Sequence, residues 1–482
     1  MNAFTSALKD KTTETRTLNG SLTYSTSLSS NVDLFFLGSA LRGQSESRIT
    51  NLFAKAMAED SRIAMANLWY IRDIRGGQGE RQQARNIVKY LAKNYTDLIT
   101  VEFINKLVNY GRYDDILVLL DTHKDLVIEY IRERLGNEDS LLAKWLPSEN
   151  TSSVKTKQYA KMIRKGLGIS SQEYRKILSQ LRAKQHLVET ALTNKDYDSI
   201  QYDHLPSKAG LKYRKAFLNK DAERYKAFLT AVNSGERKIN TGTLTPVDIV
   251  GKYFQNYWCN RPSDDAVLNT MWNNLPDVFN GEYENSIVVA DTSGSMTSSY
   301  NGTSVKPISV CIALAMYIAE RNKGLFKDTF MTFSDRPQLQ EIKGKDLFEK
   351  INNLSKADWN GSTNLDAVFD KILRACCEHN VDDDECPKRI YIISDMEFNN
   401  CVYSDTTTMN RIRQKYIECG YEIPQIFFWN VNSKTENVPV RFNEKGVGLI
   451  SGFSPIILRY ILNKEEVTPE TIMMETLSRY LD

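Results

Sequence analysis

The most constraining feature of the chain is a short apolar run that ends in a polar cluster. Residues 286–296 read Ser-Ile-Val-Val-Ala-Asp-Thr-Ser-Gly-Ser-Met. Such a run is typical of a strand that is buried on both faces of a parallel sheet. It delivers Asp291, Ser293 and Ser295 to the turn at its carboxyl end, where open α/β sheets bind ligands. One carboxylate and two hydroxyls form an oxygen-only set, which suits Mg²⁺ or Mn²⁺.

Strand and helix patterns alternate from this run to the end of the chain. Alternation of this kind predicts right-handed βαβ units, and therefore a doubly wound parallel sheet that is covered on both faces. The further strands are expected at residues 329–333, 389–393, 425–429 and 448–450, and the helices at 306–322, 345–353, 364–379, 407–419, 454–462 and 469–480.

The chain before this region has a helical pattern. Apolar residues recur at helical spacing from residue 46 onward, and the expected helices are short and joined by brief turns. This predicts stacked helix pairs in a solenoid-like, HEAT-like repeat. Residues 1–45 are rich in Ser, Thr and Asn and are expected to form an arm, with a short strand or docked segment at Val32–Leu37. The expected organisation is an N-terminal arm (1–45), an α-helical repeat domain (46–280) and an α/β domain (281–482).

Two later loops add candidate metal ligands. Residues 360–365, Asn-Gly-Ser-Thr-Asn-Leu, place Thr363 in a loop just before a helix, and Asp395 follows the apolar run at 389–393. Because the loops of a βαβ series meet at one edge of the sheet, these groups are expected to share an ion with Asp291. The alternative is a plain turn at 291–295, since Asp, Ser and Gly are common turn residues.

Composition excludes several classes of protein. No apolar run reaches the roughly 18 residues of a membrane-spanning helix, and the N-terminus lacks the pattern of a signal peptide. The seven cysteines show no zinc-finger spacing and indicate reduced thiols. We therefore expect no membrane partner and a cytoplasmic location, in the host cytoplasm if the source is a virus.

A basic stretch in the helical half predicts binding to nucleic acid. Residues 151–260 carry 20 Lys and Arg against 9 Asp and Glu, with tyrosines such as Tyr159 and Tyr225 among them. Cations neutralise phosphates and tyrosines stack on bases. The alternative is a solvated helix face with its tyrosines in the core. An arginine–glycine run at 72–81 adds to the candidates. The alternative is a helix–helix loop whose arginines pair with Asp73 and Glu80. The candidate RNA-binding residues are Arg72, Arg75, Arg81, Arg112, Lys155, Lys157, Lys161, Arg164, Lys165, Lys212, Arg214 and Lys215.

The Asp-Thr-Ser-Gly-Ser sequence at 291–295 resembles the Asp-x-Ser-x-Ser motif of von Willebrand factor A domains. The resemblance extends from residue 286 to the end of the chain. It implies a metal-ion-dependent adhesion site, in which Asp291, Ser293 and Ser295 match the first loop, Thr363 the second and Asp395 the third. It also implies that Mg²⁺ or Mn²⁺ serves recognition, with the carboxylate of a partner protein completing the coordination sphere.

The helical half resembles the TROVE module of the Ro autoantigen family. The runs that carry this resemblance are Arg-Asp-Ile-Arg-Gly-Gly-Gln-Gly-Glu-Arg at 72–81 and Tyr-Gly-Arg-Tyr-Asp-Asp at 110–115. The whole layout is also similar to an uncharacterised TROVE-like family of viral, plant and bacterial proteins. The resemblance implies a helical-repeat ring or arc that binds RNA, either small structured RNA or single-stranded 3′ ends, followed by an A-type domain.

The expected function is that of a non-catalytic RNA-binding scaffold, a ribonucleoprotein component with a metal-dependent site. One alternative is a protein-interaction or assembly factor that binds no RNA. Another is a Mg²⁺-dependent enzyme acting on phosphate esters, for which the chain offers Asp291, Asp335, Asp358 and Asp395. A serine hydrolase is disfavoured, since the four histidines lie far from the 291–295 motif in the sequence.

Overall fold

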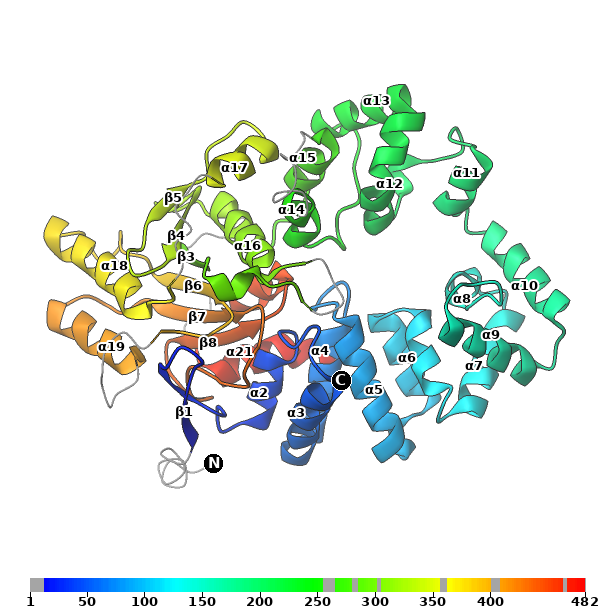
Figure 1. Cartoon of the computed structure of the whole chain (residues 1–482), viewed down its shortest axis with the longest axis horizontal. Helices are drawn as coiled ribbons and strands as arrows, with labels where there is room; N and C mark the ends of the chain where they lie inside the picture. Colours follow the sequence, from blue (N-terminus) through cyan, green and yellow to red (C-terminus); the bar gives the residue numbers. More distant parts are fainter. Residues whose placement is uncertain are drawn as a thin grey trace. The chain divides into compact units, whose positions relative to one another are not determined.

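The computed structural model of the chain describes residues 13–254, 265–279, 285–300, 305–355, 362–399, 408–462 and 466–481. The chain divides into two compact units. The sheet unit comprises Met1–Asn67 and Leu244–Asp482, and the helical unit comprises Leu68–Thr243. The expected combination of an N-terminal helical region with a C-terminal, mostly parallel sheet is therefore confirmed (Figure 1). Helices on either side of the helical unit pack with the sheet unit, so the chain passes between the units at residues 67–68 and 243–244.

A six-stranded sheet forms the centre of the sheet unit, in the order β5-β4-β3-β6-β7-β8. Five strands are parallel and confirm the predicted strands: β3 (Ser286–Asp291), β4 (Thr329–Phe333), β6 (Arg389–Ser394), β7 (Gln425–Asn430) and β8 (Val447–Ser451). The edge strand β5 (Leu339–Glu341) is antiparallel to β4 and has no counterpart in the prediction. It was missed because it is short and half exposed, and so lacks an apolar run.

Helices cover both faces of this sheet. Every residue of β3 and β6 is buried, as expected for strands that are enclosed on both sides. α16 (Pro307–Arg321) leads from β3 to β4, and α19 (Thr408–Cys419) leads from β6 to β7 in the opposite direction across the sheet. Right-handed crossovers that run in opposite directions place their helices on opposite faces. The other helices of the βα series are α17 (Leu347–Leu354), α18 (Leu365–His379), α20 (Leu458–Ile461) and α21 (Pro469–Leu477).

The N-terminal segment belongs to the sheet unit. β1 (Glu14–Arg16) and β2 (Leu22–Tyr24) form a small antiparallel sheet, and α2 (Ser30–Leu37) and α3 (Glu46–Glu59) follow. α2 is buried at seven of its eight residues and packs beside β8. The segment Val32–Leu37 is thus docked, as predicted, but as a helix and not as a strand. A short apolar run without a polar face does not distinguish these two structures.

Two further helices from the middle of the chain also join the sheet unit. α14 (Pro246–Phe254) packs against α16, and α15 (Ala266–Asn273) packs against α17. The indole Nε1 of Trp272 donates a 2.7 Å hydrogen bond to Glu320 Oε2 of α16. A buried indole that finds an acceptor in this way fixes α15 against the helical layer of the sheet.

The helical unit consists of short helices that pack mainly against their neighbours in the sequence. α7 contacts α8 and α9, α8 contacts α10, and α12 contacts α13. Contacts between successive helices are what stacked helix pairs require. The helices are α4 (Ser61–Arg72), which begins in the sheet unit, α5 (Arg81–Asn94), α6 (Val101–Tyr110), η3 (Tyr113–Leu119), α7 (Lys124–Gly136), α8 (Ser140–Trp145), α9 (Val154–Leu167), α10 (Ser171–Ala183), α11 (Val188–Asn194), α12 (Ser207–Lys220) and α13 (Ala222–Asn233).

In the described parts of the chain, no helix combines the length and the apolar character that crossing a membrane requires.

Candidate metal centre

The polar residues that the sequence singled out lie at a switch point of the sheet. From β3 the chain moves to β4 on one side, and from β6 it moves to β7 on the other, while β3 and β6 are themselves neighbours. The crevice at the carboxyl ends of two such strands is the usual ligand site of an open α/β sheet. Asp291 is the last residue of β3, and Asp395 directly follows the last residue of β6.

The loop after β3 brings its three predicted ligands together. Asp291 is fully buried, and its Oδ1 accepts a 2.9 Å hydrogen bond from the backbone N–H of Ser293. The Oγ atoms of Ser293 and Ser295 lie 2.9 Å apart. Residues Gly294–Thr297 form a 3₁₀ turn that sets this spacing. The two hydroxyls therefore lie side by side and share a hydrogen bond in the loop that also holds Asp291.

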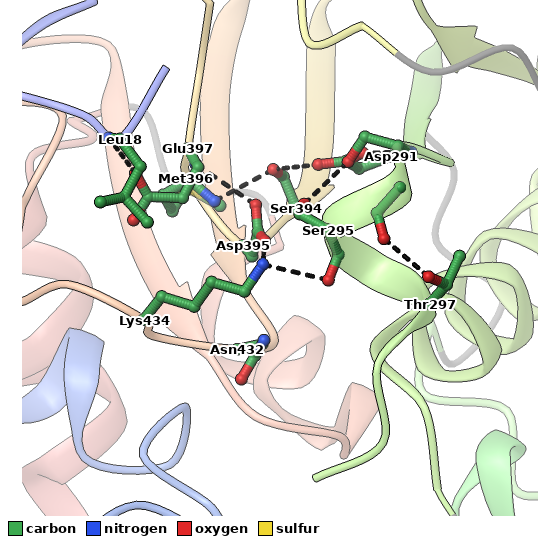
Figure 2. A network of polar contacts seen from close by, with 12 residues as sticks. Leu18, Asp291, Ser295, Thr297, Ser394, Asp395, Met396, Glu397, Asn432 and Lys434 are labelled. Atoms are coloured by element: carbon green, nitrogen blue, oxygen red, sulfur yellow. Dashed lines mark hydrogen bonds and ion pairs between the residues drawn. The ribbon is translucent and has the colours of Figure 1, made fainter. Parts of the chain in front are cut away.

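The loop after β6 supplies the second carboxylate. Ser394 Oγ donates a 2.6 Å hydrogen bond to Asp291 Oδ2 and so connects the two loops (Figure 2). Met396 has a φ of 65°, a left-handed conformation that is uncommon for a residue with a side chain. The Asp395 side chain is buried, and its Oδ1 accepts from the backbone N–H of Glu397 at 3.3 Å.

The two carboxylates of the site influence each other. Burial, followed by the nearby charge of Asp395, raises the pKa of Asp291 to about 6. Burial and the charge of Asp291 also raise the pKa of the Cys311 thiol, which donates to the carbonyl of Ile393 at 3.2 Å. The site is therefore short of positive charge, and a bound cation would reverse the effect on Asp291.

Thr363 joins the site through the loop after β6. Its Oγ1 donates a 2.8 Å hydrogen bond to the carbonyl of Glu397, and its own carbonyl accepts from the backbone N–H of Asn399 at 2.9 Å. A hydroxyl that donates its proton to a carbonyl keeps its lone pairs for a cation. The structure therefore places Thr363 beside the loop that carries Asp395, where its hydroxyl contacts Glu397 and Asn399.

The donor set fits a small divalent cation. In an octahedron with bonds of about 2.1 Å, as Mg²⁺ requires, adjacent oxygens lie about 3.0 Å apart. Ser293 Oγ and Ser295 Oγ, which hydrogen-bond to each other at 2.9 Å, are close enough for both to contact one such ion. Buried polar atoms without a hydrogen-bond partner in the described part of the chain include Thr292 Oγ1, Ser362 Oγ and Asp395 Oδ2. The described residues contain no group of three or more His, Cys, Asp and Glu that could hold a metal ion. A metal here would therefore depend on hydroxyls as much as on carboxylates.

Three features of the site have no counterpart in the sequence-based prediction. Lys434, from the segment after β7, places its Nζ 3.0 Å from Asp395 Oδ2 and 3.0 Å from the carbonyl oxygen of Ser295. Its geometry toward Asp395 is that of an ion pair and not of a hydrogen bond, so Oδ2 has no donor within the described ranges. Glu397 is buried and accepts from the backbone N–H of Leu18 at 2.7 Å. The N-terminal segment thus holds the loop after β6. Local sequence patterns do not predict a contact between segments so far apart in the chain.

Of the four carboxylates named for a phosphate-ester enzyme, two lie together at the carboxyl ends of β3 and β6. Asp291 and Asp395 meet at the switch point, as described above. Asp335 is exposed and accepts a 3.0 Å hydrogen bond from Asn364 Nδ2. Asp358 lies outside the described residues.

Arg72 was predicted to bind RNA, but its guanidinium is part of a buried ion-pair network. Arg72 is 1% exposed, and its Nε and Nη2 donate to Asp115 Oδ2 at 2.8 and 2.6 Å. Arg85 donates to the other oxygen of Asp115 at 2.7 Å, and Arg112 pairs with Asp114 at 2.9 Å. Of the arginines in the 72–81 run, Arg72 therefore has an acidic partner, as the alternative held, but that partner is Asp115 of the second motif and not Asp73 or Glu80. Arg72 is unable to reach a phosphate because it is enclosed by the fold.

The other basic candidates separate into exposed and engaged side chains. Arg214 is buried and donates to the carbonyl of Leu211. Its prediction as an RNA-binding residue is therefore wrong, as it is for Arg72. Arg164 is half-buried and pairs with Glu149 at 2.9 Å. Tyr159 and Tyr225 are buried, which places these two tyrosines in the core and not on a stacking surface. The exposed candidates are Arg75, Arg81, Lys155, Lys157, Lys161, Lys165, Lys212 and Lys215.

Comparison with known proteins finds relatives for both units. A family described as a domain of unknown function, DUF7788, matches residues 285–479, which carry the sheet and the candidate metal centre. The uncharacterized protein L728 of Acanthamoeba polyphaga mimivirus is 29% identical over 518 residues, covering 96% of this chain and 87% of that protein. A second family, also described as a domain of unknown function, DUF2828, matches residues 17–111 and 120–282, which is more than half of the chain. The chain therefore belongs to the DUF2828 family.

Proposed function

We propose that the protein is a non-catalytic RNA-binding scaffold whose sheet unit binds a divalent cation, Mg²⁺ or Mn²⁺, and through it an acidic partner. The observation that carries the proposal is the convergence of Asp291, Ser293, Ser295 and Asp395 at the switch point of the sheet. Counted from its first strand, the sheet has the order 3-2-1-4-5-6, that of a doubly wound fold. This order supports a domain of the von Willebrand factor A type.

In this proposal, residues from three loops would hold the ion. Asp291, Ser293 and Ser295 would bind it from the loop after β3, and Thr363 and Asp395 from the other two loops. A divalent cation bound there supplies positive charge and an open coordination position for a carboxylate. The buried hydrogen bond from Ser394 to Asp291 keeps one carboxylate oxygen in place, so the first loop is ordered before the ion arrives.

Calorimetric titration with MnCl₂ or MgCl₂ tests the metal site. We expect wild-type protein to bind one ion and the Asp291→Asn variant to bind none, because the variant loses the central anionic ligand. Asp383→Asn is the matched control, since Asp383 is an exposed carboxylate in the same unit. Equal affinity of the Asp291→Asn variant and the wild type would refute the site.

An exposed basic stripe on α9 supports RNA binding by the helical unit. Lys157, Lys161 and Lys165 are exposed and follow one another at four-residue spacing, so they lie along one face of the helix. The opposite face of α9 buries Tyr159 and Ile163 in the core. Such a stripe can neutralise successive phosphates without competing acidic partners. We assign the helical unit to a TROVE-like, HEAT-like repeat on the strength of its stacked pairs and its two motifs.

Fluorescence anisotropy with a labelled single-stranded RNA tests this surface. Replacing Lys157, Lys161 and Lys165 by Glu should weaken binding and lower the slope of log affinity against log salt by about 2, since each phosphate contact to a single strand contributes about 0.7. A control variant carries the same charge change at Lys93, Lys327 and Lys445, which are exposed and far apart in the sequence. It should bind as the wild type does.

The same experiments distinguish the alternative functions. If the wild type binds neither single-stranded nor hairpin RNA at low salt, the RNA-binding part is wrong, and a protein-assembly role becomes the better description. Release of phosphate from a phosphate ester that disappears in the Asp291→Asn variant would overturn the non-catalytic part.

A further inference from the structure

The ammonium group of Lys434 lies between the two loops that a divalent ion would connect. Its Nζ is 3.0 Å from Asp395 Oδ2, in the loop after β6, and donates to the carbonyl of Ser295, in the loop after β3, at 3.0 Å (Figure 2). We propose that Lys434 is a built-in cation that competes with the divalent ion for Asp395. This inference rests on the proposed metal site and concerns how that site is regulated.

The charges of the site favour such an exchange. Asp395 has a side chain that is 0% exposed, and Lys434 is its ion-pair partner in the described part of the chain. The Lys434 side chain is 28% exposed, so its ammonium group can move into water while the carboxylate stays buried. A divalent ion attracts the carboxylates more strongly than an ammonium group does, and it repels that group at short distance.

The segment that carries Lys434 is held by contacts on both sides of the lysine. The N–H of Ser433 donates to the carbonyl of Ala40 at 3.0 Å, and Thr435 Oγ1 donates to Glu397 Oε1 at 2.7 Å. Val438 pairs with Tyr24 of β2. With both sides of Lys434 attached to other elements, the exchange requires only a rotation of the lysine side chain.

This arrangement makes the site selective for ions of higher charge. A monovalent cation carries the same charge as the ammonium group, so replacing Lys434 by such an ion yields no additional attraction to Asp395. A divalent ion doubles the charge that faces Asp291 and Asp395. Lys434 therefore excludes Na⁺ and K⁺ while leaving the site open to Mg²⁺ or Mn²⁺, at the cost of some affinity for the divalent ion.

Titration with MnCl₂ of the full-length wild type and of a Lys434→Met variant tests this inference. Methionine retains most of the length of the lysine side chain but carries no charge. We expect the variant to bind Mn²⁺ at least about tenfold more tightly, because the competing cation is gone. Lys445→Met is the matched control: Lys445 is an exposed lysine of the same β7–β8 connection, and its loss should leave the affinity unchanged.

Thermal unfolding provides a second measurement, because in EDTA it reports the stability of the metal-free protein and not its affinity for the ion. The Lys434→Met variant should have a lower Tm than the wild type in EDTA, because Asp395 loses its counter-charge, and saturating Mn²⁺ should remove the difference. Lys434→Gln serves the same purpose if the methionine variant does not fold, and Lys434→Arg, which keeps the charge, should retain the wild-type affinity.

The outcomes separate this inference from the proposed metal site. Equal or weaker Mn²⁺ binding by the Lys434→Met and Lys434→Gln variants would overturn the competition and leave the metal site intact. Mn²⁺ binding by these variants but not by the wild type would support both. If neither the variants nor the wild type bind Mn²⁺, the metal site itself is wrong and the inference fails with it.

Discussion

Both units bury charged side chains, but they balance these charges in opposite ways. In the helical unit, Asp115 receives hydrogen bonds from the guanidinium groups of Arg72 and Arg85, one on each carboxylate oxygen. In the sheet unit, Asp291 and Asp395 lie near each other, and a partly exposed lysine, Lys434, pairs with Asp395. In the helical cluster each buried carboxylate oxygen of Asp115 has a guanidinium partner. The strand-end site holds two buried carboxylates against one lysine, an excess of negative charge that suits the cation site proposed above.

The largest expected effect is on the helical cluster. Replacing Asp115 by Ala leaves Arg72 buried without its counter-charge, which should lower the free energy of unfolding by about 3–5 kcal/mol. Asp114→Ala is the control, because Asp114 is 19% exposed and pairs only with the half-buried Arg85 and Arg112. It should cost about 1 kcal/mol or less. Urea unfolding measures both free energies. Equal decreases in the two variants would show that the buried Asp115 contributes no more to stability than the partly exposed Asp114.

A smaller effect is expected at the strand-end site, where the charge of the buried carboxylate lowers the free energy of unfolding and does not raise it as at Asp115. The pKa of Asp291, raised to about 6, means that the folded protein binds this proton more tightly than the unfolded chain does. The free energy of unfolding should therefore fall as the pH rises from about 4 to about 6, by about 3 kcal/mol in the absence of metal. The Asp291→Asn variant should lose this dependence, measured by urea unfolding in EDTA.

The same Asp383→Asn control should keep the wild-type dependence on pH. An Asp291→Asn variant that is destabilised at pH 7 and has the same pH profile as the wild type would show that Asp291 is balanced in the folded protein. The contrast between the two units would then disappear.

The smallest expected effect concerns the backbone of the helical cluster. A Cβ at Gly111 would clash with Asp115 Oδ2 and lie 2.7 Å from the carbonyl oxygen of Leu107. Gly111→Ala should therefore cost about 2 kcal/mol, since the ion-paired carboxylate has little freedom to move. At Gly136, in α7, a Cβ would meet no atom within 4 Å, and Gly136→Ala should stabilise the protein by about 0.5–1 kcal/mol. Thermal unfolding of the two variants separates close packing from general helix propensity.

The parts that were predictable follow from regular topology. The strands at Ser286–Asp291 and Arg389–Ser394 are apolar throughout, and parallel strands joined by helices align their carboxyl ends. Asp291 and Asp395 were therefore expected at the same edge of the sheet, and the pairing of β3 with β6 makes them neighbours. The first 45 residues were harder, because a short segment such as α2 is apolar on every side and has no period that separates helix from strand.

The direction of side chains on loops was not predictable in the same way. Arg72 and Arg75 belong to one motif, yet Arg72 is buried against Asp115 and Arg75 is exposed. The inward-facing Arg72 pairs with a carboxylate 43 residues away, that of Asp115, although Asp73 and Glu80 of its own motif are buried as well. Composition showed an excess of cations but could not assign them to the surface or to the interior.

The sequence by itself determined the class of the fold and which polar residues stand at the strand ends, because apolar runs and their spacing dictate which strands are buried and where they end. Only the tertiary structure decided which charges balance one another. It brought Lys434 to Ser295 across 139 residues and Leu18 to Glu397 across 379. Contacts between residues so far apart in the sequence arise when whole helices and strands pack together. They therefore cannot be predicted from the sequence around either residue.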